Sequence, residues 1–322
     1  MTVIVKAEGL SRSFKVGRGM LGRRHDVFAV RDVDLAVNHA EIVGIVGESG
    51  CGKSTLGRLL LRLLEPSAGR VLFDGQDVAQ MPSAELRRVR RRMQMVFQDP
   101  FGSLDPRRRI GAQVGDGLQA GAGAGATQAE RVEALLAQVG LDPAHAQRLP
   151  HEFSGGQRQR IAIARALSTS PDFIVADEPV AALDVSIQAQ IVNLLADLRA
   201  QFGLALVFVS HDLHIVRHLA DRLVVMYLGR VVEEGPAKEV FQAPAHPYTR
   251  ALIAATPSMR GKPGRERPTL PGDLPSPLNP PSGCVFRTRC EYAQPRCAES
   301  RPPLEPTTAG RRVACLRTRE IA

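Results

Sequence analysis

The segment from Gly47 to Ser54 constrains the fold more than any other part of the 322-residue chain. It reads Gly-Glu-Ser-Gly-Cys-Gly-Lys-Ser, which matches the pattern of a phosphate-binding loop. An apolar run, Val43–Val46, precedes the loop, and a leucine-rich helical stripe follows it and ends at Pro66. A strand, a glycine-rich loop and a helix in this order predict an α/β fold with a site for nucleotide phosphates.

The residue types in this loop suit the binding of ATP and Mg²⁺. Glycines let the backbone curl so that successive N–H groups and the helix N-terminus face the phosphates. Lys53 is predicted to reach the β- and γ-phosphates, and Ser54 to ligate Mg²⁺. Cys51 is expected to be an ordinary loop residue and not a nucleophile. The predicted ATP site consists of Gly47, Glu48, Ser49, Gly50, Cys51, Gly52, Lys53, Ser54 and Thr55.

Two adjacent carboxylates follow the apolar run Phe173–Ala176. Because neighbouring side chains at the end of a strand point in different directions, Asp177 and Glu178 can have different roles. Asp177 is predicted to hold Mg²⁺ through water, and Glu178 to polarise the water that attacks ATP. Such a pair is also typical of a charged helix N-terminus, but the phosphate-binding loop favours the catalytic interpretation.

Short β-branched runs alternate with longer helical segments over most of the chain, which is typical of a mostly parallel sheet covered by helices. We therefore predict a nucleotide-binding domain over residues 1–242, with a helical insertion at about 99–153. Proline density then rises, so residues 243–322 are predicted to form a small extension with a proline-rich linker at 257–281. No internal repeat is evident, which indicates a single nucleotide-binding unit.

The insertion is expected to contain a helix of its own. Thr127 and Glu130 form a capping-box pattern at its start, and Gly140 ends it. The preceding stretch Ala120–Ala126 alternates alanine and glycine, which predicts a flexible connection. A second helix is expected after Ser154, which has the features of an N-cap.

Composition and charge narrow the classes of function. Hydrophobic residues make up 44% and charged residues 23%, which excludes disorder throughout. The longest apolar runs, such as Leu204–Val209, are far shorter than the roughly 18 residues of a membrane-spanning helix, so no crossing is expected. The first ten residues lack the pattern of a signal peptide, which predicts a cytoplasmic location. A net charge of +9 suits nucleotide phosphates, nucleic acid or an anionic membrane surface equally.

The segment Phe153–Gln157, Phe-Ser-Gly-Gly-Gln, resembles the signature motif of ABC transporter ATPases. The resemblance implies a P-loop NTPase of the ABC type, with a mostly parallel sheet core, an antiparallel β subdomain and a helical subdomain. It further implies that the signature of one cassette faces the γ-phosphate bound to another, in a head-to-tail dimer. From the residues alone, Ser154 would be a simple N-cap. The signature residues are Ser154, Gly155, Gly156 and Gln157.

The resemblance also implies roles for single residues elsewhere. Gln98 links Mg²⁺ and the attacking water to the permease, Asp184 lies in a dimer-facing loop, and His211 contacts the γ-phosphate. A lone histidine after a strand would otherwise be a hydrogen-bonded structural residue. Phe14 is expected to stack on the adenine, with Phe28 as the competing aromatic residue.

Three further segments are similar to the ATPase subunits of oligopeptide and dipeptide importers: Gln98–Pro106, His246–Thr249 and Leu274–Pro277. The implied function is to power import of di- or oligopeptides, or of related solutes such as nickel or glutathione, by ATP hydrolysis. The implied partners are two membrane permease subunits, a second and non-identical ATPase subunit, and an extracytoplasmic solute-binding protein. The implied location is the cytoplasmic face of the inner membrane.

Four of the five cysteines lie near the end of the chain, at Cys284, Cys290, Cys297 and Cys315. Four thiols suit a tetrahedral zinc ion or an iron–sulfur cluster, but the close pair typical of zinc sites is missing. The resemblance implies a 4Fe–4S cluster in some relatives, with zinc and free thiols as the alternatives. Arg287, Arg289 and Arg296 are expected to offset the negative charge of thiolate ligands.

A dense run of basic residues indicates a competing function. Its members are Arg87, Arg88, Arg90, Arg91 and Arg92. A solvated helix face near lipid headgroups explains the run, and no aromatic residue interleaves with it as nucleic-acid binding would favour. The competing function is a nucleic-acid-associated ABC ATPase that works without a permease. The single cassette and the importer-like tail argue against it, so no nucleic-acid partner is expected.

Overall fold

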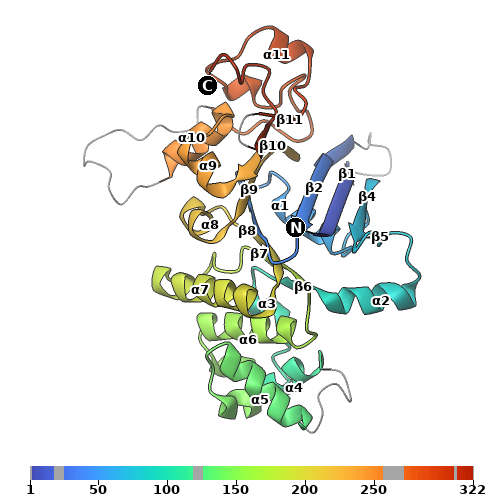
Figure 1. Ribbon diagram of the computed structural model, residues 1–322, viewed down its shortest axis with the longest axis vertical. Coiled ribbons are helices and arrows are strands. Elements are labelled where there is room, and N and C mark those ends of the chain that lie inside the picture. The colour runs from blue at the N-terminus through green and yellow to red at the C-terminus, as the bar shows by residue number, and fades with distance from the viewer. Residues whose placement is uncertain (1, 18–24, 119–125, 257–271, 308–309, 322) are drawn as a thin grey trace.

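The computed structural model describes residues 2–17, 25–118, 126–256, 272–307 and 310–321 (Figure 1). The expected flexible connection therefore lies outside the described residues except for Ala126, as do residues 257–271 of the predicted linker. Within the described ranges, no helix is both long enough and apolar enough to cross a membrane.

The larger sheet has eight strands, which are in spatial order β11 (Glu305–Pro306), β12 (Arg312–Val313), β10 (Arg230–Pro236), β9 (Arg222–Tyr227), β3 (Ile42–Val46), β8 (Ala205–Val209), β7 (Phe173–Asp177) and β6 (Met93–Val96). From β9 to β6 every neighbouring pair is parallel. The three strands at the other edge pair antiparallel. The predicted mostly parallel core is confirmed, and the carboxyl ends of β3 and β7 meet at one edge.

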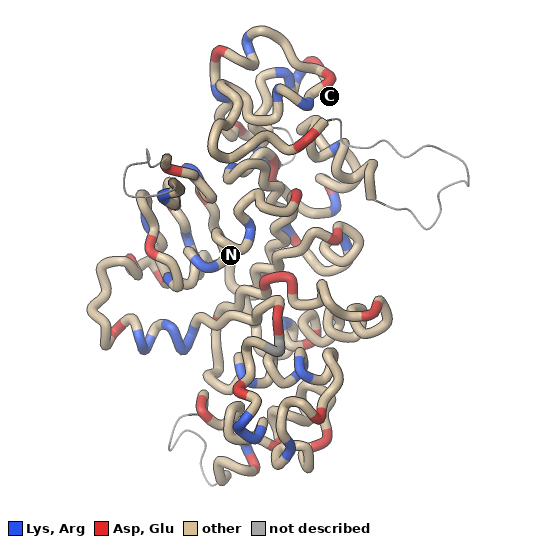
Figure 2. The backbone as a smooth tube through the Cα atoms, turned by 180° about the vertical axis from the view of Figure 1, so that it is seen from behind, with Lys and Arg blue, Asp and Glu red and all other residues tan. Residues whose placement is uncertain are grey.

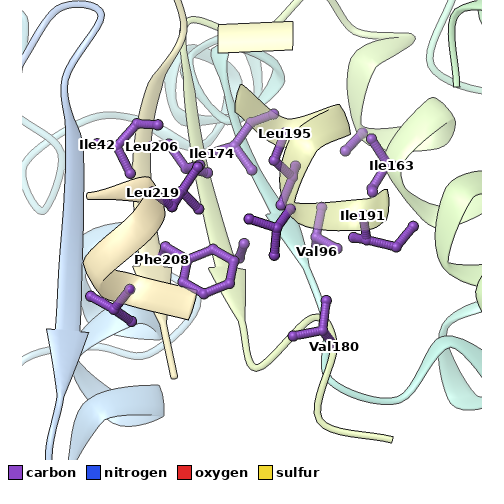
Figure 3. Close-up of a cluster of buried hydrophobic side chains, with 14 of the residues drawn as sticks. Ile42, Val96, Ile163, Ile174, Val180, Ile191, Leu195, Leu206, Phe208 and Leu219 are labelled. Carbon is purple, nitrogen blue, oxygen red and sulfur yellow. The ribbon is translucent and has the colours of Figure 1, made fainter. Parts of the chain in front are cut away.

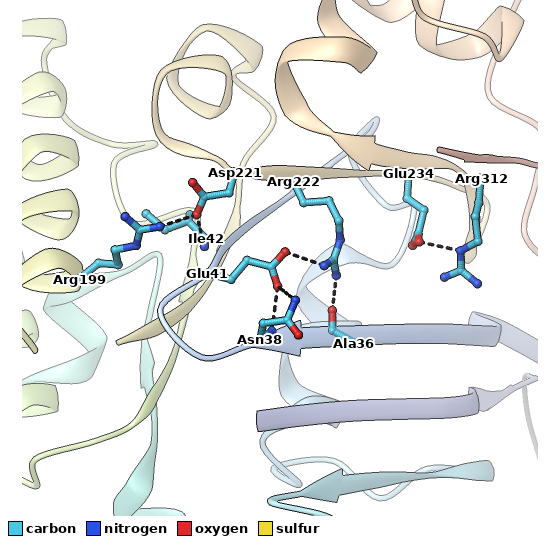
Figure 4. Close-up of polar contacts among 9 residues, drawn as sticks. All are labelled: Ala36, Asn38, Glu41, Ile42, Arg199, Asp221, Arg222, Glu234 and Arg312. Atoms are coloured by element: carbon cyan, nitrogen blue, oxygen red, sulfur yellow. Dashed lines mark hydrogen bonds and ion pairs between the residues drawn. The ribbon is translucent and has the colours of Figure 1, made fainter. Parts of the chain in front are cut away.

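The smaller sheet is antiparallel, in the order β2 (His25–Asn38), β1 (Val3–Val16), β4 (Ala68–Phe73) and β5 (Gln76–Asp77). Arg222 at the start of β9 joins the two sheets, because it donates to the Glu41 carboxylate and to the Ala36 carbonyl on β2 (Figure 4). Asp221 accepts a 2.8 Å hydrogen bond from the Ile42 backbone N–H. These contacts hold the start of the strand that leads into the phosphate-binding loop.

The helices cover the sheets and build a separate lobe. They are α1 (Lys53–Leu60), α2 (Ser83–Arg92), α3 (Pro100–Ser103), α4 (Ile110–Gly115), α5 (Gln128–Gln138), α6 (Gly155–Leu167), α7 (Val185–Phe202), α8 (Leu213–Leu219), α9 (Ala237–Gln242), α10 (Pro247–Ala255) and α11 (Arg296–Glu299), with short 3₁₀ helices η1 (Pro143–Gln147), η2 (Pro150–Glu152) and η3 (Arg287–Arg289). Helices α3 to α6 gather at the lower end of the molecule in Figure 1, which confirms the helical subdomain.

The capping box predicted at the start of the insertion helix is present. The Thr127 hydroxyl accepts from the Glu130 backbone N–H, and the Glu130 carboxylate accepts from the Thr127 N–H. Gly140 has a φ of 72°, the left-handed conformation that ends a helix most readily at glycine. Both ends of α5 therefore follow from local sequence.

Helix α1 is shorter than predicted, and this part of the prediction is wrong. The leucine stripe up to Pro66 led us to expect a helix across Leu63, but α1 ends at Leu60. Arg62 has a φ of 54°, which turns the chain out of the helix. As a result the Leu63 side chain is 47% exposed. The chain then leads to β4 in the neighbouring sheet, which begins at Ala68.

The core lies on both faces of the main sheet, because alternate residues of each strand point to opposite sides. Along β7, Ile174 packs into the cluster on one face and Val175 into the cluster on the other. Figure 3 shows Leu195 of α7 next to Ile174, and Ile191 of the same helix next to Val96 and Ile163. Burial on both faces explains why β3, β7 and β8 are continuous apolar runs.

The C-terminal extension joins the main sheet. In the register of β12 and β10, Val313 lies opposite Glu233 and Arg312 lies opposite Glu234. The Arg312 guanidinium also donates a 2.7 Å hydrogen bond to the Glu234 carboxylate (Figure 4). The extension therefore packs directly against the strands that flank the nucleotide-binding core.

Positive charge concentrates along α2, as Figure 2 shows. This helix buries no residue, in agreement with the prediction of a solvated face. Three of its arginines are nevertheless bonded to the rest of the domain. Arg90 donates to the Arg62 carbonyl, Arg91 to the Gly117 carbonyl, and Arg92 to the carboxylates of Asp172 and Asp74. Part of the basic run therefore anchors the helix.

Candidate functional site

The phosphate-binding loop lies between β3 and α1, and its glycines are required by close backbone contacts. A Cβ atom at Gly47 would lie 2.2 Å from the Met226 carbonyl oxygen, and one at Gly52 would lie 2.0 Å from the Ala29 carbonyl oxygen. Gly52 also has a φ of 104°, which L-residues with side chains rarely adopt. Side chains at these two positions would push the loop away from β2 and β9.

Lys53 and Cys51 are both buried within the loop. The Lys53 ammonium donates to the carbonyl oxygens of Gly47 at 2.8 Å and Glu48 at 3.1 Å. It therefore lies over the loop, where it can follow bound phosphates. Burial raises the pKa of the Cys51 thiol, which supports its interpretation as a packing residue and not a nucleophile.

Ser54 and Asp177 are 123 residues apart in the sequence and in direct contact in the structure. The Ser54 hydroxyl donates to Asp177 Oδ1 at 2.7 Å, so a hydroxyl and a carboxylate oxygen lie together at the edge of the sheet. Both are ligand types that Mg²⁺ prefers. Burial raises the pKa of Asp177, and the hydrogen bond from Ser54 opposes this. A divalent cation would compensate the buried carboxylate charge.

Glu178 and His211 face each other from the ends of neighbouring strands. His211 Nδ1 lies 3.4 Å from Glu178 Oε2, and the histidine side chain is 59% exposed. Glu178 has a φ of 46°, and its backbone N–H donates to the Val209 carbonyl at 3.0 Å. Asp177 contacts Ser54, whereas Glu178 lies near His211, so the two acids have different partners as the strand pattern predicts.

Gln98 follows β6, the strand next to β7. It lines the same open cleft as Asp177, together with Arg58 and Arg165. The structure therefore brings Gln98 to the side of the site where Ser54 and Asp177 meet.

The signature segment forms the start of α6. Ser154 Oγ accepts from the Gln157 backbone N–H at 3.3 Å, and the Gln157 side chain accepts from the Ser154 N–H at 3.0 Å. The predicted N-cap is thereby confirmed. A Cβ at Gly156 would lie 2.5 Å from Ile187 Cγ2, so this glycine allows α6 to approach α7 closely.

The dimer-facing role of the signature segment and of Asp184 stays a prediction. Both lie on an exposed surface, which this role requires. Ser154 and Asp184 are exposed, and Asp184 is the residue that precedes α7. The next side chain, Val185, is 82% exposed, which is unusual for an apolar residue at a well-ordered helix start. A partner surface would cover it.

The two candidate adenine-stacking residues have equivalent surroundings. Phe14 on β1 is 37% exposed, and the Arg12 guanidinium lies 4.9 Å from its ring centre. Phe28 on β2 is 36% exposed, and Arg31 lies 4.7 Å from its ring centre. The choice of Phe14 therefore remains a prediction, with Phe28 as the alternative.

The four C-terminal cysteines line one small pocket, between α10 and the end of the chain. Burial raises the pKa of Cys284 to about 11 and also raises the pKa values of Cys290 and Cys315. Across the described residues, no group of three or more His, Cys, Asp or Glu side chains is placed to hold a metal ion. The thiols thus share a pocket without converging on one point.

Two residues at the site were not recognised from the sequence. Arg289, which we expected to offset thiolate charge, donates two hydrogen bonds to the Glu48 carboxylate, at 2.7 and 3.1 Å. The Tyr248 hydroxyl accepts from the Glu48 backbone N–H at 2.8 Å. These partners are 241 and 200 residues from Glu48 in the chain, and no local pattern signals such contacts.

The phosphate-binding loop, the carboxylates at the end of β7 and the capped signature helix together define an ATP-hydrolysing cassette that uses ATP and Mg²⁺. A family model described as "ABC transporter" matches residues 30–181. A second model, "Oligopeptide/dipeptide transporter, C-terminal region", matches residues 232–297.

Relatives match over nearly the whole chain. The oligopeptide transport ATP-binding protein AppF of Bacillus subtilis is 48% identical over 317 residues, which cover 97% of this chain and 96% of AppF. The di/tripeptide transport ATP-binding protein DppF of Pseudomonas aeruginosa is 46% identical over 316 residues, with 98% of each chain covered. The chain belongs to the oligopeptide and dipeptide transporter group of ABC transporter ATP-binding proteins.

The fold is also that of solved cassettes. A bacterial ABC transporter cassette solved as a dimer matches with a TM-score of 0.65 and 31% identity, and the match covers 73% of this chain and 99% of the cassette. A dimer in a post-hydrolysis state bound to ADP and phosphate matches with a TM-score of 0.64. These comparisons confirm the predicted fold class and the ATPase activity.

Proposed function

We propose that this chain hydrolyses ATP to power the import of di- and oligopeptides through two membrane permease subunits. The observation that carries the proposal is the match of residues 232–297 to the oligopeptide/dipeptide transporter C-terminal region. AppF and DppF, whose names state peptide transport, are also similar to this chain over nearly its whole length. The chain acts at the cytoplasmic face of the inner membrane, beside a second and related ATPase subunit. A solute-binding protein on the other side delivers the peptide.

Each residue of the site has a defined part in this activity. Lys53 holds the β- and γ-phosphates, and Ser54, Gln98 and Asp177 provide the oxygen ligands on the Mg²⁺ side. A bound Mg²⁺ ion neutralises phosphate charge and polarises the γ-phosphate. Glu178 accepts the proton of the attacking water, and this requires its deprotonated form.

Further residues act beside the hydrolytic centre. In this proposal His211, whose Nδ1 lies 3.4 Å from Glu178 Oε2, contacts the γ-phosphate. Ser154 and its signature neighbours complete the site of the partner cassette. The transported solute passes through other chains, so no residue of this chain is assigned to it.

Uptake by whole cells tests the proposal. Cells that lack this chain should lose uptake of a radiolabelled dipeptide and tripeptide, and the wild-type chain should restore it. Arg319→Gln, a change of an exposed arginine of the extension, should restore uptake as well, whereas Glu178→Gln should not. Intact peptide uptake with lost nickel or glutathione uptake would contradict the substrate class. Intact uptake of all these solutes, with nucleic-acid binding by the purified chain, would overturn the transport function.

We also propose that the four C-terminal cysteines hold a 4Fe–4S cluster. Their shared pocket supports this. Each thiolate of such a cluster binds a different iron, whereas zinc takes all its ligands on one ion, and the close cysteine pair typical of zinc sites is missing from the sequence. Burial raises the pKa values of Cys284, Cys290 and Cys315 because it disfavours a bare thiolate, and the positive charge of bound iron would stabilise the thiolate form.

Anaerobic purification tests this cluster. The protein should be brown, lose its visible absorption in air, and contain about four iron atoms per chain. Cys290→Ser should lose most of the iron, whereas Cys51→Ser, a change of the one cysteine outside the pocket, should keep it. Colourless protein with stoichiometric zinc would contradict the proposal.

A further inference from the structure

The C-terminal extension holds the phosphate-binding loop at one residue, Glu48. Arg289 Nη1 donates to Glu48 Oε2 at 2.7 Å, and Nη2 donates to Oε1 at 3.1 Å. The Arg289 side chain is 4% exposed and that of Glu48 is 25% exposed. Because Tyr248 also accepts from the Glu48 backbone N–H, the extension fixes both the side chain and the backbone of this loop residue.

The groups that hold Glu48 are themselves firmly packed. Tyr227 and Tyr248 are fully buried, and their ring centres are 4.7 Å apart. The Phe286 ring lies 5.3 Å from each of them. Arg289 Nη1 is also 3.4 Å from the Tyr227 hydroxyl. The guanidinium is therefore held in one orientation, and its hydrogen bonds to Glu48 raise the pKa of Arg289 above its ordinary value.

Glu48 carries a negative charge inside a loop that binds a polyphosphate. A carboxylate there repels the phosphates of ATP unless a cation neutralises it. The contacts above show that Arg289 supplies this cation, in the two-bond geometry that a guanidinium and a carboxylate form best. The Glu48 carbonyl oxygen also accepts from the Lys53 ammonium at 3.1 Å, so the position of Glu48 bears on that of Lys53.

We propose that Arg289 is a positioning residue for the phosphate-binding loop, which neutralises Glu48 and holds the loop in the shape that binds ATP. The ATP site of this cassette is then completed by a region more than 200 residues away in its own chain. The same segment carries the cysteine pocket, because Cys290 directly follows Arg289. The inference rests on ATP binding and is independent of which solute is transported.

Nucleotide binding by Arg289 variants of the purified full chain provides the first test. Arg289→Gln should raise both the Kd and the KM for ATP about tenfold, with kcat at saturating ATP within about threefold of wild type. Arg289→Lys keeps the charge but loses the two-bond geometry, so its Kd should be intermediate. Arg319→Gln, which removes an exposed arginine of the same extension, is the matched control and should leave Kd unchanged.

A rescue experiment separates this role from general damage to the extension. Glu48→Gln removes the charge that Arg289 neutralises, so the Glu48→Gln, Arg289→Gln double variant should bind ATP within about threefold of Glu48→Gln alone. Loss of an arginine that only supports folding would not be rescued by changing its partner. An equal rise in Kd in both backgrounds, or no rise for Arg289→Gln in the wild-type background, would overturn the proposal.

The packing of the extension can be followed in the same samples. The chain has no tryptophan and three tyrosines, Tyr227, Tyr248 and Tyr292. The first two lie against Phe286 and the third lines the cysteine pocket, so the near-ultraviolet circular dichroism of tyrosine reports on this region. A weakened ATP affinity with a native tyrosine spectrum is the expected result for Arg289→Gln. If that variant loses the native spectrum, the Kd of Arg289→Lys and the rescue by Glu48→Gln test the proposal instead.

Discussion

His246 makes the stability of the C-terminal extension dependent on pH. Its side chain is 1% exposed, and Nδ1 accepts a 3.0 Å hydrogen bond from the Tyr248 backbone N–H at the start of α10. Burial lowers the pKa of His246 to about 3, although a hydrogen bond with the Ala314 backbone opposes this. The imidazole is therefore neutral in the folded protein at pH values well above 3.

The size and sign of the effect follow from this pKa. A histidine in an unfolded chain has a pKa of about 6.5, so below that pH the unfolded state binds a proton that the folded state does not. The stability from neutral His246 is present above pH 6.5 and is lost as pH falls towards 3. Between pH 7 and pH 5 the loss amounts to about 2 kcal/mol.

Urea unfolding at several pH values measures this loss. Tyrosine fluorescence is a suitable signal, because the chain has no tryptophan and Tyr248 lies two residues from His246. His246→Asn is the comparison, since asparagine can accept the same backbone hydrogen bond at the helix start but does not titrate. Between pH 7 and pH 5 the free energy of unfolding should fall by about 2 kcal/mol more for the wild type than for the variant. An equal pH dependence for the two proteins would refute the reasoning.

Three further predictions concern the ATP site. Lys53→Ala should lower ATP hydrolysis at least about 100-fold, because the loop loses the cation that follows the phosphates, and near-normal turnover would contradict this. Glu178→Gln should bind ATP but hydrolyse it at least about 100-fold more slowly, and gel filtration with ATP should show a longer-lived dimer; a monomer with unchanged turnover would exclude the base assignment. Ser154→Arg should spare ATP affinity while blocking hydrolysis at the opposing site, so a collapse of affinity would show that the signature does not act across a dimer.

Local sequence determined the elements whose structure depends on residues a few positions apart. The capping box at Thr127 and the N-cap at Ser154 each join residues three apart, and both are formed as predicted. The reciprocal bond from the Ser154 N–H to the Gln157 side chain was not predicted. The order of strand, glycine-rich loop and helix around Lys53 is likewise local, and so are the apolar runs of β3, β7 and β8. Even here α1 ended before the leucine stripe did, because the chain leaves the helix at Arg62, which has a φ of 54°.

Only the tertiary structure decided which distant residues meet. Ser54 contacts Asp177 because the strand order places β7 two strands from β3, with both carboxyl ends at one edge. Glu48 is held by Arg289 because β10 and β12 pair and bring the extension back to the core. Such contacts span more than 100 residues, so no periodicity or local pattern encodes them. They form when the sheet assembles, because its apolar faces are then buried and charged groups from distant segments are brought together.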